Sequence, residues 1–356
     1  SPQPSSRHPR RASARPGVRA AGGRCAPEYS EAVPENRLST SGLALAVGAY
    51  GLWGFLPAYF LLLAPSGPVE IVAWRVVLSL VFCGILLAAS RAFRPFAALL
   101  RDRRVMGLSL VAGILIAINW IVYVYGSTSG FVVEAALGYF INPIVSIGLG
   151  VIFLRERLRA GQWAAVGISV IAVLVLAIGY GQPPWIALTL AFSFGFYGFI
   201  KNRMGGRVSA VAGLTLETAW LVPVALVALV AVELAGGVTM GREGIAHALL
   251  LSLAGVVTAV PLLLFAAASR RLPLSVMGFI QYLAPLMQFA FGVIVLLEPM
   301  PLERWIGFAL VWVALIVLTA EAVLHRRRAA RARRAEAAGA PPGATDPVAT
   351  GAIPTV

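Results

Sequence analysis

The sequence predicts an all-α integral membrane protein whose ten transmembrane helices form two inverted five-helix repeats. Three observations support this fold class. First, 59% of the residues are hydrophobic and only 12% are charged, whereas soluble domains carry about 25% charged residues. Second, apolar segments of about 18–25 residues recur along the chain, each long enough to cross a ~30 Å hydrocarbon core as a helix. Third, a pattern of residues returns 142 positions later (285 − 143 = 142).

The ten apolar segments are joined by short connections and flanked by two polar tails. Residues 1–38 are rich in Arg, Pro and Ser and predict a disordered, basic N-terminal tail; an Arg-rich, acid-poor start is also typical of organelle transit peptides. Residues 326–356 predict a C-terminal tail that is first basic and then disordered. The predicted helices cover residues 40–63, 68–89, 105–126, 131–154, 160–179, 183–201, 209–235, 245–268, 273–297 and 302–324.

The repeat is clearest around the fourth and ninth segments. Its positions in the first half return in the second half with the same spacing: Pro143, Gly150, Glu156 and Trp163 correspond to Pro285, Gly292, Glu298 and Trp305. Each predicted half, 39–180 and 181–325, contains five helices, so the second half must enter the membrane from the opposite side. Inverted repeats of this kind are the architecture of many secondary transporters.

The basic residues predict the orientation of the chain in the membrane. Of the 29 Lys and Arg residues, nearly all lie in the two tails and in alternate connections, while the opposite connections carry only Arg242 and Arg304. By the positive-inside rule both termini are therefore cytoplasmic. The net charge of +14 does not indicate nucleic acid, because the charges flank apolar segments, where the basic C-terminal part would meet anionic membrane lipids.

Two charged residues lie deep inside the predicted helices, away from the helix ends. Arg75 and Glu217 correspond in the repeat, since 75 + 142 = 217. A charge at the centre of a membrane helix costs roughly 2.5–3.5 kcal/mol, which favours a functional role. Their predicted depths differ by about 10 Å, so two long side chains could form an intramembrane charge pair that takes part in coupling. The alternatives are a purely structural ion pair, or an arginine that reaches outward to the membrane surface.

Polar and aromatic residues in the same helices predict a solute pathway. Pro143 and Pro285 remove backbone donors and predict helix breaks, which are tolerated in a membrane where they face protein or a water-filled cavity. Aromatic rings with a polar atom suit a cavity for an organic solute, although each ring alone is as well explained by packing. The candidate substrate-binding residues are Trp53, Asn119, Trp120, Tyr139, Asn142, Tyr197, Gln281 and Tyr282.

Three carboxylates near predicted helix ends have simpler explanations. Glu134 is expected to be a favourable charge at a helix N-terminus, or else a coupling carboxylate at the cavity mouth. Glu156 and Glu298 are expected to be solvated helix ends. With three histidines and two cysteines that are scattered along the chain, no metal site is predicted. No Walker loop or Ser/His/Asp set is present in the sequence, so no cofactor is expected.

Four motifs stand out in the apolar segments: Leu137-Gly-Tyr-Phe-Ile-Asn-Pro143, Leu190-Ala-Phe-Ser-Phe-x-Phe-Tyr-Gly198, Leu216-Glu-Thr-x-Trp-Leu-x-Pro223 and Gln281-Tyr-x-x-Pro285. They resemble the RarD branch of the EamA transporters, in the drug/metabolite transporter superfamily. The resemblance covers about residues 40–325 and implies a bacterial inner-membrane protein. It also implies a central cavity lined mainly by helices 1, 3, 4, 6, 8 and 9. The chain departs from the pattern at Trp74, where relatives are expected to have His.

The sequence and the resemblance together favour a secondary active transporter of small organic metabolites or drugs, working by alternating access. Protons or a counter-transported solute would supply the driving force. The competing hypotheses are an intramembrane enzyme or an accessory membrane subunit that acts on a lipid-linked substrate. An enzyme is not predicted, because the sequence lacks the nucleophile or acid–base cluster that such chemistry requires.

Overall fold

A computed structural model of the chain describes residues 39–155, 158–180, 183–204, 208–272 and 274–339. The chain divides into two units, Ser1–Arg37 and Leu38–Val356. The predicted N-terminal tail, Glu156, and the last part of the C-terminal tail lie outside the described residues. Everything below concerns the second unit.

The described residues form helices and no strands, in agreement with the predicted all-α class. In chain order the helices are α1 Thr40–Gly54, α2 Leu56–Leu61, α3 Pro68–Ala89, α4 Phe93–Arg101, α5 Arg103–Thr128, α6 Val132–Leu154, α7 Ala160–Tyr180, α8 Trp185–Met204, α9 Ala210–Ala235, α10 Gly244–Ser252, α11 Ala254–Ser269, α12 Leu274–Ile280, α13 Leu283–Ala290, the π-helical turn η1 Phe291–Val295 and α14 Leu302–Gly339.

Nine helical segments among the described residues are long and apolar enough to cross a membrane. They correspond to nine of the ten predicted segments. The tenth, predicted at 183–201, corresponds to α8, which has 20 residues but a lower hydropathy because Lys201 and Asn202 lie near its end. The described part of the chain thus contains nine candidate membrane-spanning helices, and the tenth stays a prediction.

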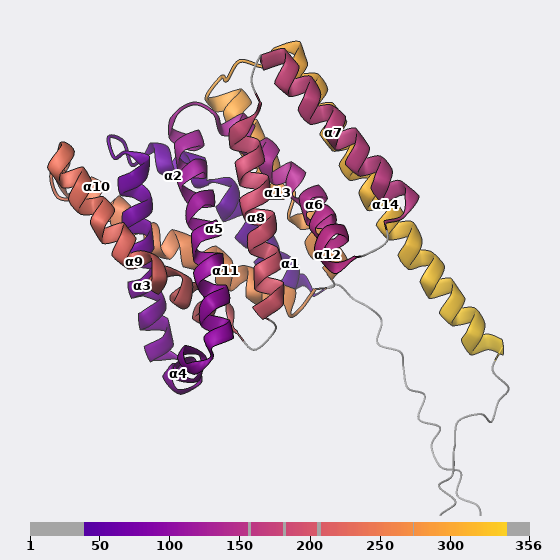
Figure 1. Ribbon diagram of the computed structural model, residues 1–356, viewed down its shortest axis with the longest axis horizontal. Coiled ribbons are helices and arrows are strands. Elements are labelled where there is room, and N and C mark those ends of the chain that lie inside the picture. The colour runs from indigo at the N-terminus through magenta and orange to yellow at the C-terminus, as the bar shows by residue number, and fades with distance from the viewer. Residues whose placement is uncertain (1–38, 156–157, 181–182, 205–207, 273, 340–356) are drawn as a thin grey trace, which may run out of the picture. The chain divides into compact units, whose positions relative to one another are not determined.

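The helices of the two halves pack against each other rather than forming separate bodies. Helix α3 packs against α9, α6 against α13, and α7 against α14; Figure 1 shows α7 and α14 side by side along their length. The remaining main contacts come in matched pairs. Helix α1 contacts α11 as α8 contacts α5, α3 contacts α11 as α9 contacts α5, and α6 contacts α8 as α13 contacts α1.

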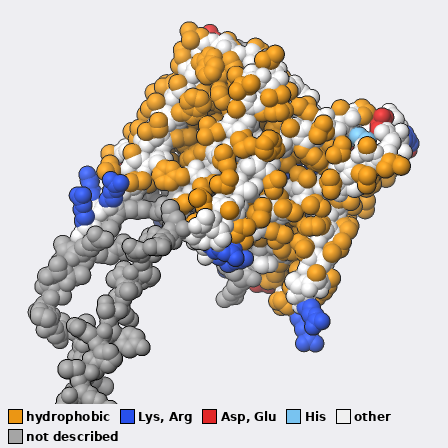
Figure 2. Space-filling model, turned by 180° about the vertical axis from the view of Figure 1, so that it is seen from behind, with side chains coloured by type: hydrophobic (Ala, Val, Ile, Leu, Met, Phe, Trp, Pro, Cys, Tyr) orange, Lys and Arg blue, Asp and Glu red, His pale blue; other side chains and the backbone are white. Residues whose placement is uncertain are grey.

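The outer faces of the helices are apolar. On α9 the exposed side chains Trp220, Val224, Val227, Val230 and Leu234 recur every three or four residues, which places them on one face of the helix. Figure 2 shows a surface covered mostly by hydrophobic side chains, with most of the visible Lys and Arg side chains at its lower edge. An apolar belt between polar ends is what a lipid bilayer requires.

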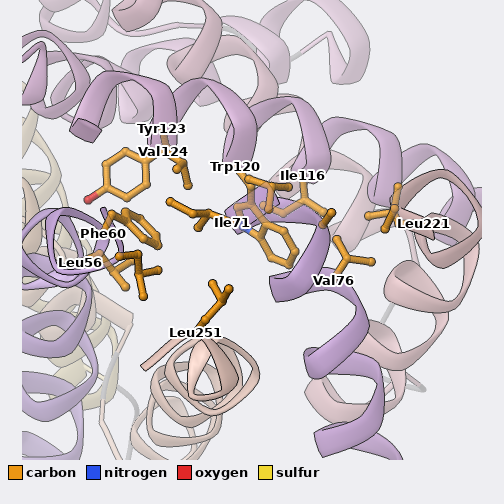
Figure 3. Packing of buried hydrophobic residues seen from close by; sticks show 14 of the residues in the cluster. Leu56, Phe60, Ile71, Val76, Ile116, Trp120, Tyr123, Val124, Leu221 and Leu251 are labelled. Atoms are coloured by element: carbon orange, nitrogen blue, oxygen red, sulfur yellow. The ribbon is translucent and has the colours of Figure 1, made fainter. Parts of the chain in front are cut away.

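Buried apolar side chains fill the space between the helices. The largest cluster joins α2, α3, α5, α9 and α10; Phe60, Trp120 and Leu221 are members, and Figure 3 shows how they lie. A second cluster joins α6, α7, α8 and α14, with Phe140 and Phe308 among its largest side chains. The walls around the centre are therefore closely packed on two sides.

One predicted feature, the helix break at Pro143, is absent from the structure. Pro143 does not break its helix, since α6 runs without interruption from Val132 to Leu154. The flanking turns of α6 are held against α8: a Cβ on Gly138 would lie 2.6 Å from the Ala187 carbonyl oxygen, and a Cβ on Gly195 would lie 2.8 Å from Val145. This packing supports the helix through the proline.

The predicted break at Pro285 does coincide with an interruption. The predicted segment 273–297 is divided into α12, a turn at Gln281 and Tyr282, α13 and η1. Proline at 285 has no amide proton to donate to the carbonyl of Gln281, four residues earlier. Helix α14 is also longer than predicted and continues to Gly339, because the Ala and Arg residues after 325 favour a helix.

Candidate functional site: a cavity between the two halves

A cavity of about 440 Å³ lies between the helices of the two halves. Its walls come from α1, α2, α3, α5, α6, α8, α9, α11, α13 and the Gln281–Tyr282 turn. The resemblance implied the helices that correspond to α1, α5, α6, α8, α11 and the α12–α13 segment, and all six contribute. The structure adds Arg75 from α3 and Ala210 and Leu214 from α9.

All eight candidate substrate-binding residues line this cavity: Trp53, Asn119, Trp120, Tyr139, Asn142, Tyr197, Gln281 and Tyr282. Arg75 and Pro285 also line it, whereas Glu217 and Pro143 are not among its lining residues. The structure thus brings together residues that are up to 229 positions apart (282 − 53 = 229). Whether they bind a solute stays a prediction.

Asn119 is the centre of a hydrogen-bond network between three helices. Its side-chain nitrogen donates to the Leu190 carbonyl oxygen at 3.3 Å and to Ser193 Oγ at 3.1 Å. Its side-chain oxygen accepts from the Tyr139 hydroxyl at 3.0 Å. Asn119 is only 2% exposed, so its amide fixes the position of the Tyr139 ring in the cavity wall.

Another part of the cavity wall is formed around the Gln281–Tyr282 turn and α13. The side chains of Gln281 and Tyr282 line the cavity there. One turn beyond Pro285, the side-chain nitrogen of Gln288 donates to the Trp53 carbonyl oxygen at 3.1 Å. The side-chain oxygens of Gln288 and Asn142 are buried and accept no hydrogen bond among the described residues. Two acceptors thus remain available in the cavity wall, one on α6 and one on α13.

Arg75 is buried in the cavity wall, with 5% of its surface exposed. Its Nε donates to Thr258 Oγ1 at 2.7 Å. The guanidinium carbon lies 4.3 Å from the centre of the Trp120 ring and 5.7 Å from that of Phe60, so two aromatic faces stabilise the cation. Its Nη1 has no hydrogen-bond partner among the described residues.

Glu217 and Arg75, which the sequence matched as a charge pair, take other partners in the structure. The Lys201 ammonium lies 2.6 Å from Glu217 Oε1, and the Tyr197 hydroxyl donates to Glu217 Oε2 at 3.1 Å. Helices α3 and α9 do adjoin, but the α8 side chains reach the carboxylate instead. The pair Lys201–Glu217 therefore replaces the expected pair, because Tyr197 and Lys201 are four residues apart and share one face of α8.

Sequence reasoning missed several lining residues. Lys201 lies at the end of the predicted helix 183–201, next to a basic connection, so its position in the sequence does not mark it as a cavity residue. Gln288 was overlooked, although it follows Gln281 by seven residues and so shares a helical face with it. Thr258 and Phe265, both on α11, also have this spacing. A search for polar and aromatic residues at helical spacing around Gln281 would have found Gln288.

The two ends of the cavity differ. At one end the lining residues Lys201, Ala210 and Ser269 lie next to basic connections. At the other end the halves are joined by a polar cluster around Glu70, which is 2% exposed. Glu70 Oε1 accepts from the amide nitrogen and hydroxyl of Thr239 at 2.7 and 3.0 Å. The Ser66 hydroxyl lies 2.6 Å from the Thr239 hydroxyl and 3.1 Å from His247 Nε2.

Two other carboxylates hold helix N-termini at the same end as Glu70. Glu134 accepts from the amide of Ile186 at 3.0 Å, so it caps α8 rather than only its own helix. Glu298 accepts from the amides of Val132 and Val133 at 2.6 and 3.0 Å. Glu298 is buried, which corrects the expectation of a solvated helix end. Among the described residues, no group of three or more His, Cys, Asp or Glu side chains could hold a metal ion.

The chain is similar to known membrane transporters. Residues 40–178 match the EamA-like transporter family. The chain is 49% identical to protein RarD of Streptomyces exfoliatus over 85% of this chain and 95% of that protein. It is 39% identical to protein RarD of Escherichia coli (strain K12), over 82% and 97% of the two chains. An uncharacterized transporter, YojE, of Bacillus subtilis (strain 168) is 41% identical over 80% and 96%.

A solved crystal structure of another protein has a similar fold. It covers 81% of this chain and 98% of its own chain with a TM-score of 0.51. The two sequences are 18% identical, so this likeness concerns the fold alone.

Proposed function

Because this chain belongs to the EamA-like transporter family as a RarD-type permease, we propose that it is a secondary active transporter that moves small organic solutes by alternating access. Its relatives are named as transporters, and the chain is not an enzyme. It is a multi-pass protein of the bacterial inner membrane. The observation that carries the proposal is the cavity, which draws its walls from both halves of the chain and contains all eight candidate binding residues.

The packing of the helices supports two inverted five-helix repeats, 39–180 and 181–325. If α1, α3, α5, α6 and α7 are exchanged for α8, α9, α11, α13 and α14, the main helix contacts are mapped onto one another. Helix α8 packs between α5 and α6 and lines the cavity, which supports a tenth crossing. With ten crossings both termini are on the same, cytoplasmic side, where the basic connections lie.

The two ends of the cavity support alternating access. It extends to the basic, cytoplasmic ends of α8, α9 and α11, whereas the polar cluster of Glu70, Thr239, Ser66 and His247 joins the halves at the external end. In the proposed cycle this cluster separates when the cavity turns outward, and equivalent contacts form at the cytoplasmic end. Inverted repeats permit such an exchange because each half can adopt the conformation of the other.

Glu217 is the proposed coupling group, with Lys201 as its partner. The carboxylate is fully buried, so it needs either the Lys201 ammonium or a proton. Movement of Lys201 during the cycle would leave Glu217 to bind a proton, and this links the conformational change to a pH gradient. A counter-transported solute is the alternative driving force. Arg75 has no such acid partner among the described residues, and in this proposal it meets the solute.

Flux measurements on the purified protein in proteoliposomes test the proposal. We expect a solute from a panel of metabolites and drugs to accumulate when a pH gradient is imposed. In Glu217→Gln, gradient-driven accumulation should be lost, while exchange of labelled for unlabelled solute at equal pH should persist. Arg94→Gln, an exposed change, serves as the control. If no solute moves under any gradient, and the protein instead turns over or binds a lipid-linked substrate, the transporter proposal is wrong.

A further inference from the structure

We propose that the transported solute is an organic carboxylate with an aromatic or apolar body, and that Arg75 binds its carboxylate group. This inference rests on the proposed transport function and gives its substrate class. Three features of the cavity carry it: the balance of charge in the wall, the unused donors of Arg75, and the aromatic surface around them.

The cavity wall has a positive charge that the chain does not neutralise. Among the described lining residues two are cationic, Arg75 and Lys201, and none is Asp or Glu. The ammonium of Lys201 is 2.6 Å from Glu217, directly behind the wall, so that charge is already paired. Arg75 forms no ion pair with a described residue and is surrounded by aromatic rings and the Thr258 hydroxyl.

The guanidinium of Arg75 retains donors for a ligand. It carries five N–H groups in a planar fork that matches a carboxylate. Only Nε has an acceptor among the described residues, and Nη1 is buried without one. A buried cation without a counter-charge costs free energy, and a carboxylate from the solute would remove that cost. The fixed contacts with Thr258 and Trp120 hold the fork in position before the solute arrives.

The remaining wall fits the body of such a solute. Trp53, Phe194, Tyr197, Phe265 and Tyr282 line the same cavity, and rings of this kind pack on flat apolar groups. The side-chain oxygens of Asn142 and Gln288, both in the wall, are free to accept. A solute that combines a carboxylate with an N–H or O–H group would satisfy both sides of the cavity.

Calorimetric binding to the purified full-length protein tests the charge preference. The probes are two matched sets: 3-phenylpropionate, 3-phenylpropionamide and 3-phenylpropylamine, and indole-3-acetate, indole-3-acetamide and tryptamine. Within each set the aromatic body is the same, and only the terminal group and its charge change. We expect the carboxylate of at least one set to bind at least tenfold more tightly than its amide, and the amine to bind most weakly.

Variants assign this preference to Arg75. Arg75→Gln should bring the carboxylate and its amide within twofold of each other, and Arg75→Lys should keep part of the preference. Arg94→Gln removes an equal charge from the exposed surface and should leave binding unchanged. The comparison within each probe set uses the wild-type protein alone, so it holds even if Arg75→Gln does not fold.

Each outcome decides the proposal. Equal or tighter binding of the amides or amines, no binding of either carboxylate, or a preference that persists in Arg75→Gln would overturn it. If amines inhibit gradient-driven flux and carboxylates do not, the proposed carboxylate preference is also wrong, while the transport function stands. Conversely, a carboxylate preference without flux of any solute would contradict the transport function and leave the binding site in place.

Discussion

Glu217 is fully buried on α9, and the cation that faces it comes from α8, sixteen residues earlier in the chain. The Lys201 side chain is partly exposed, at 29%, because it also reaches the cavity. Tyr197 donates a second hydrogen bond to the same carboxylate. At the scale of single residues, the site is thus organised around two cations with different surroundings: one has a carboxylate partner and the other, Arg75, has aromatic rings.

The Lys201–Glu217 pair should be coupled energetically. Lys201→Met or Glu217→Gln alone should lower the free energy of unfolding by roughly 1–3 kcal/mol. The first leaves a fully buried carboxylate without its counter-charge, and the second leaves a partly buried ammonium without one. The double variant should lose less than the sum of the two single losses. Thermal unfolding in detergent measures the stability of the wild-type protein, the two single variants and the double variant.

The exposed ion pair Arg242–Glu233 is the control for this cycle. Replacing Arg242 with Met and Glu233 with Gln, singly and together, should change stability much less than the changes at Lys201 and Glu217, because surface pairs are screened by water. Strictly additive losses at Lys201 and Glu217 would show that the two groups do not depend on each other.

At the scale of helices, the close contact between α6 and α8 keeps Asn142 and Tyr139 in the cavity wall. Gly138 makes this contact possible, because any side chain there would collide with Ala187 and Leu190 of α8. Helix association in membranes relies on such small residues, since water exclusion contributes little between lipid-facing surfaces. The interruption between α12 and α13 acts differently, because it places the Gln281–Tyr282 turn in the cavity wall.

Gly138→Ala should therefore destabilise the protein and disturb the cavity. The added Cβ would lie 2.6 Å from the Ala187 carbonyl oxygen and 2.9 Å from Leu190 Cβ, so we expect a loss of about 1–3 kcal/mol from overpacking. Unfolding temperature and solute binding should both fall.

The matched control on the same helix is Gly148→Ala. No atom lies within 4 Å of the added Cβ at that position, and alanine favours a helix more than glycine does. Gly148→Ala should be neutral or slightly stabilising. If the two variants behave alike, the α6–α8 contact is not as close as the structure has it.

At the scale of the whole molecule, the cavity reaches the basic ends of the helices while the Glu70 cluster joins the two halves at the other end. The cluster uses hydrogen bonds to a charged carboxylate, which are stronger than those between neutral groups. In the proposed transport cycle, the strength of this cluster would set how much of the population is closed at the external end. Weakening it should shift the population toward the outward-facing state.

Glu70→Gln should increase access to the cavity from outside. The reporter is Ile116→Cys, since Ile116 lines the cavity and is 5% exposed, in a protein whose native Cys25 and Cys83 are replaced with Ala. A membrane-impermeant maleimide should label this cysteine faster from the cytoplasmic side in inside-out vesicles than from outside in spheroplasts. Glu70→Gln should raise the outside rate several-fold, because the neutral amide accepts weaker hydrogen bonds.

Glu243→Gln, an exposed change near the same end of the molecule, should leave both labelling rates unchanged. If the Ile116→Cys protein with Glu70 intact is labelled faster from outside, or if Glu70→Gln does not change the outside rate, the assignment of the closed end is wrong.

Much of the fold and of the candidate site could be predicted because a membrane constrains a sequence strongly. A helix is the only open-ended structure that satisfies its own backbone in lipid, so apolar length alone located the spanning helices. The eight candidate binding residues were found because polar and aromatic side chains stand out in apolar helices, and the structure places all eight around one cavity. The interruption near Pro285 follows from the amide proton that proline lacks, and packing does not compensate for it there as it does at Pro143.

What only the tertiary structure decided is which partner each polar group takes. The sequence by itself determined that Arg75 and Glu217 lie within apolar helices and that the halves correspond at 142 residues. It did not determine that Glu217 meets Lys201, that Pro143 stays within a continuous α6, or that Glu298 is buried against the start of α6. These outcomes depend on how close neighbouring helices approach, which is set by glycine contacts and side-chain packing between segments far apart in the chain.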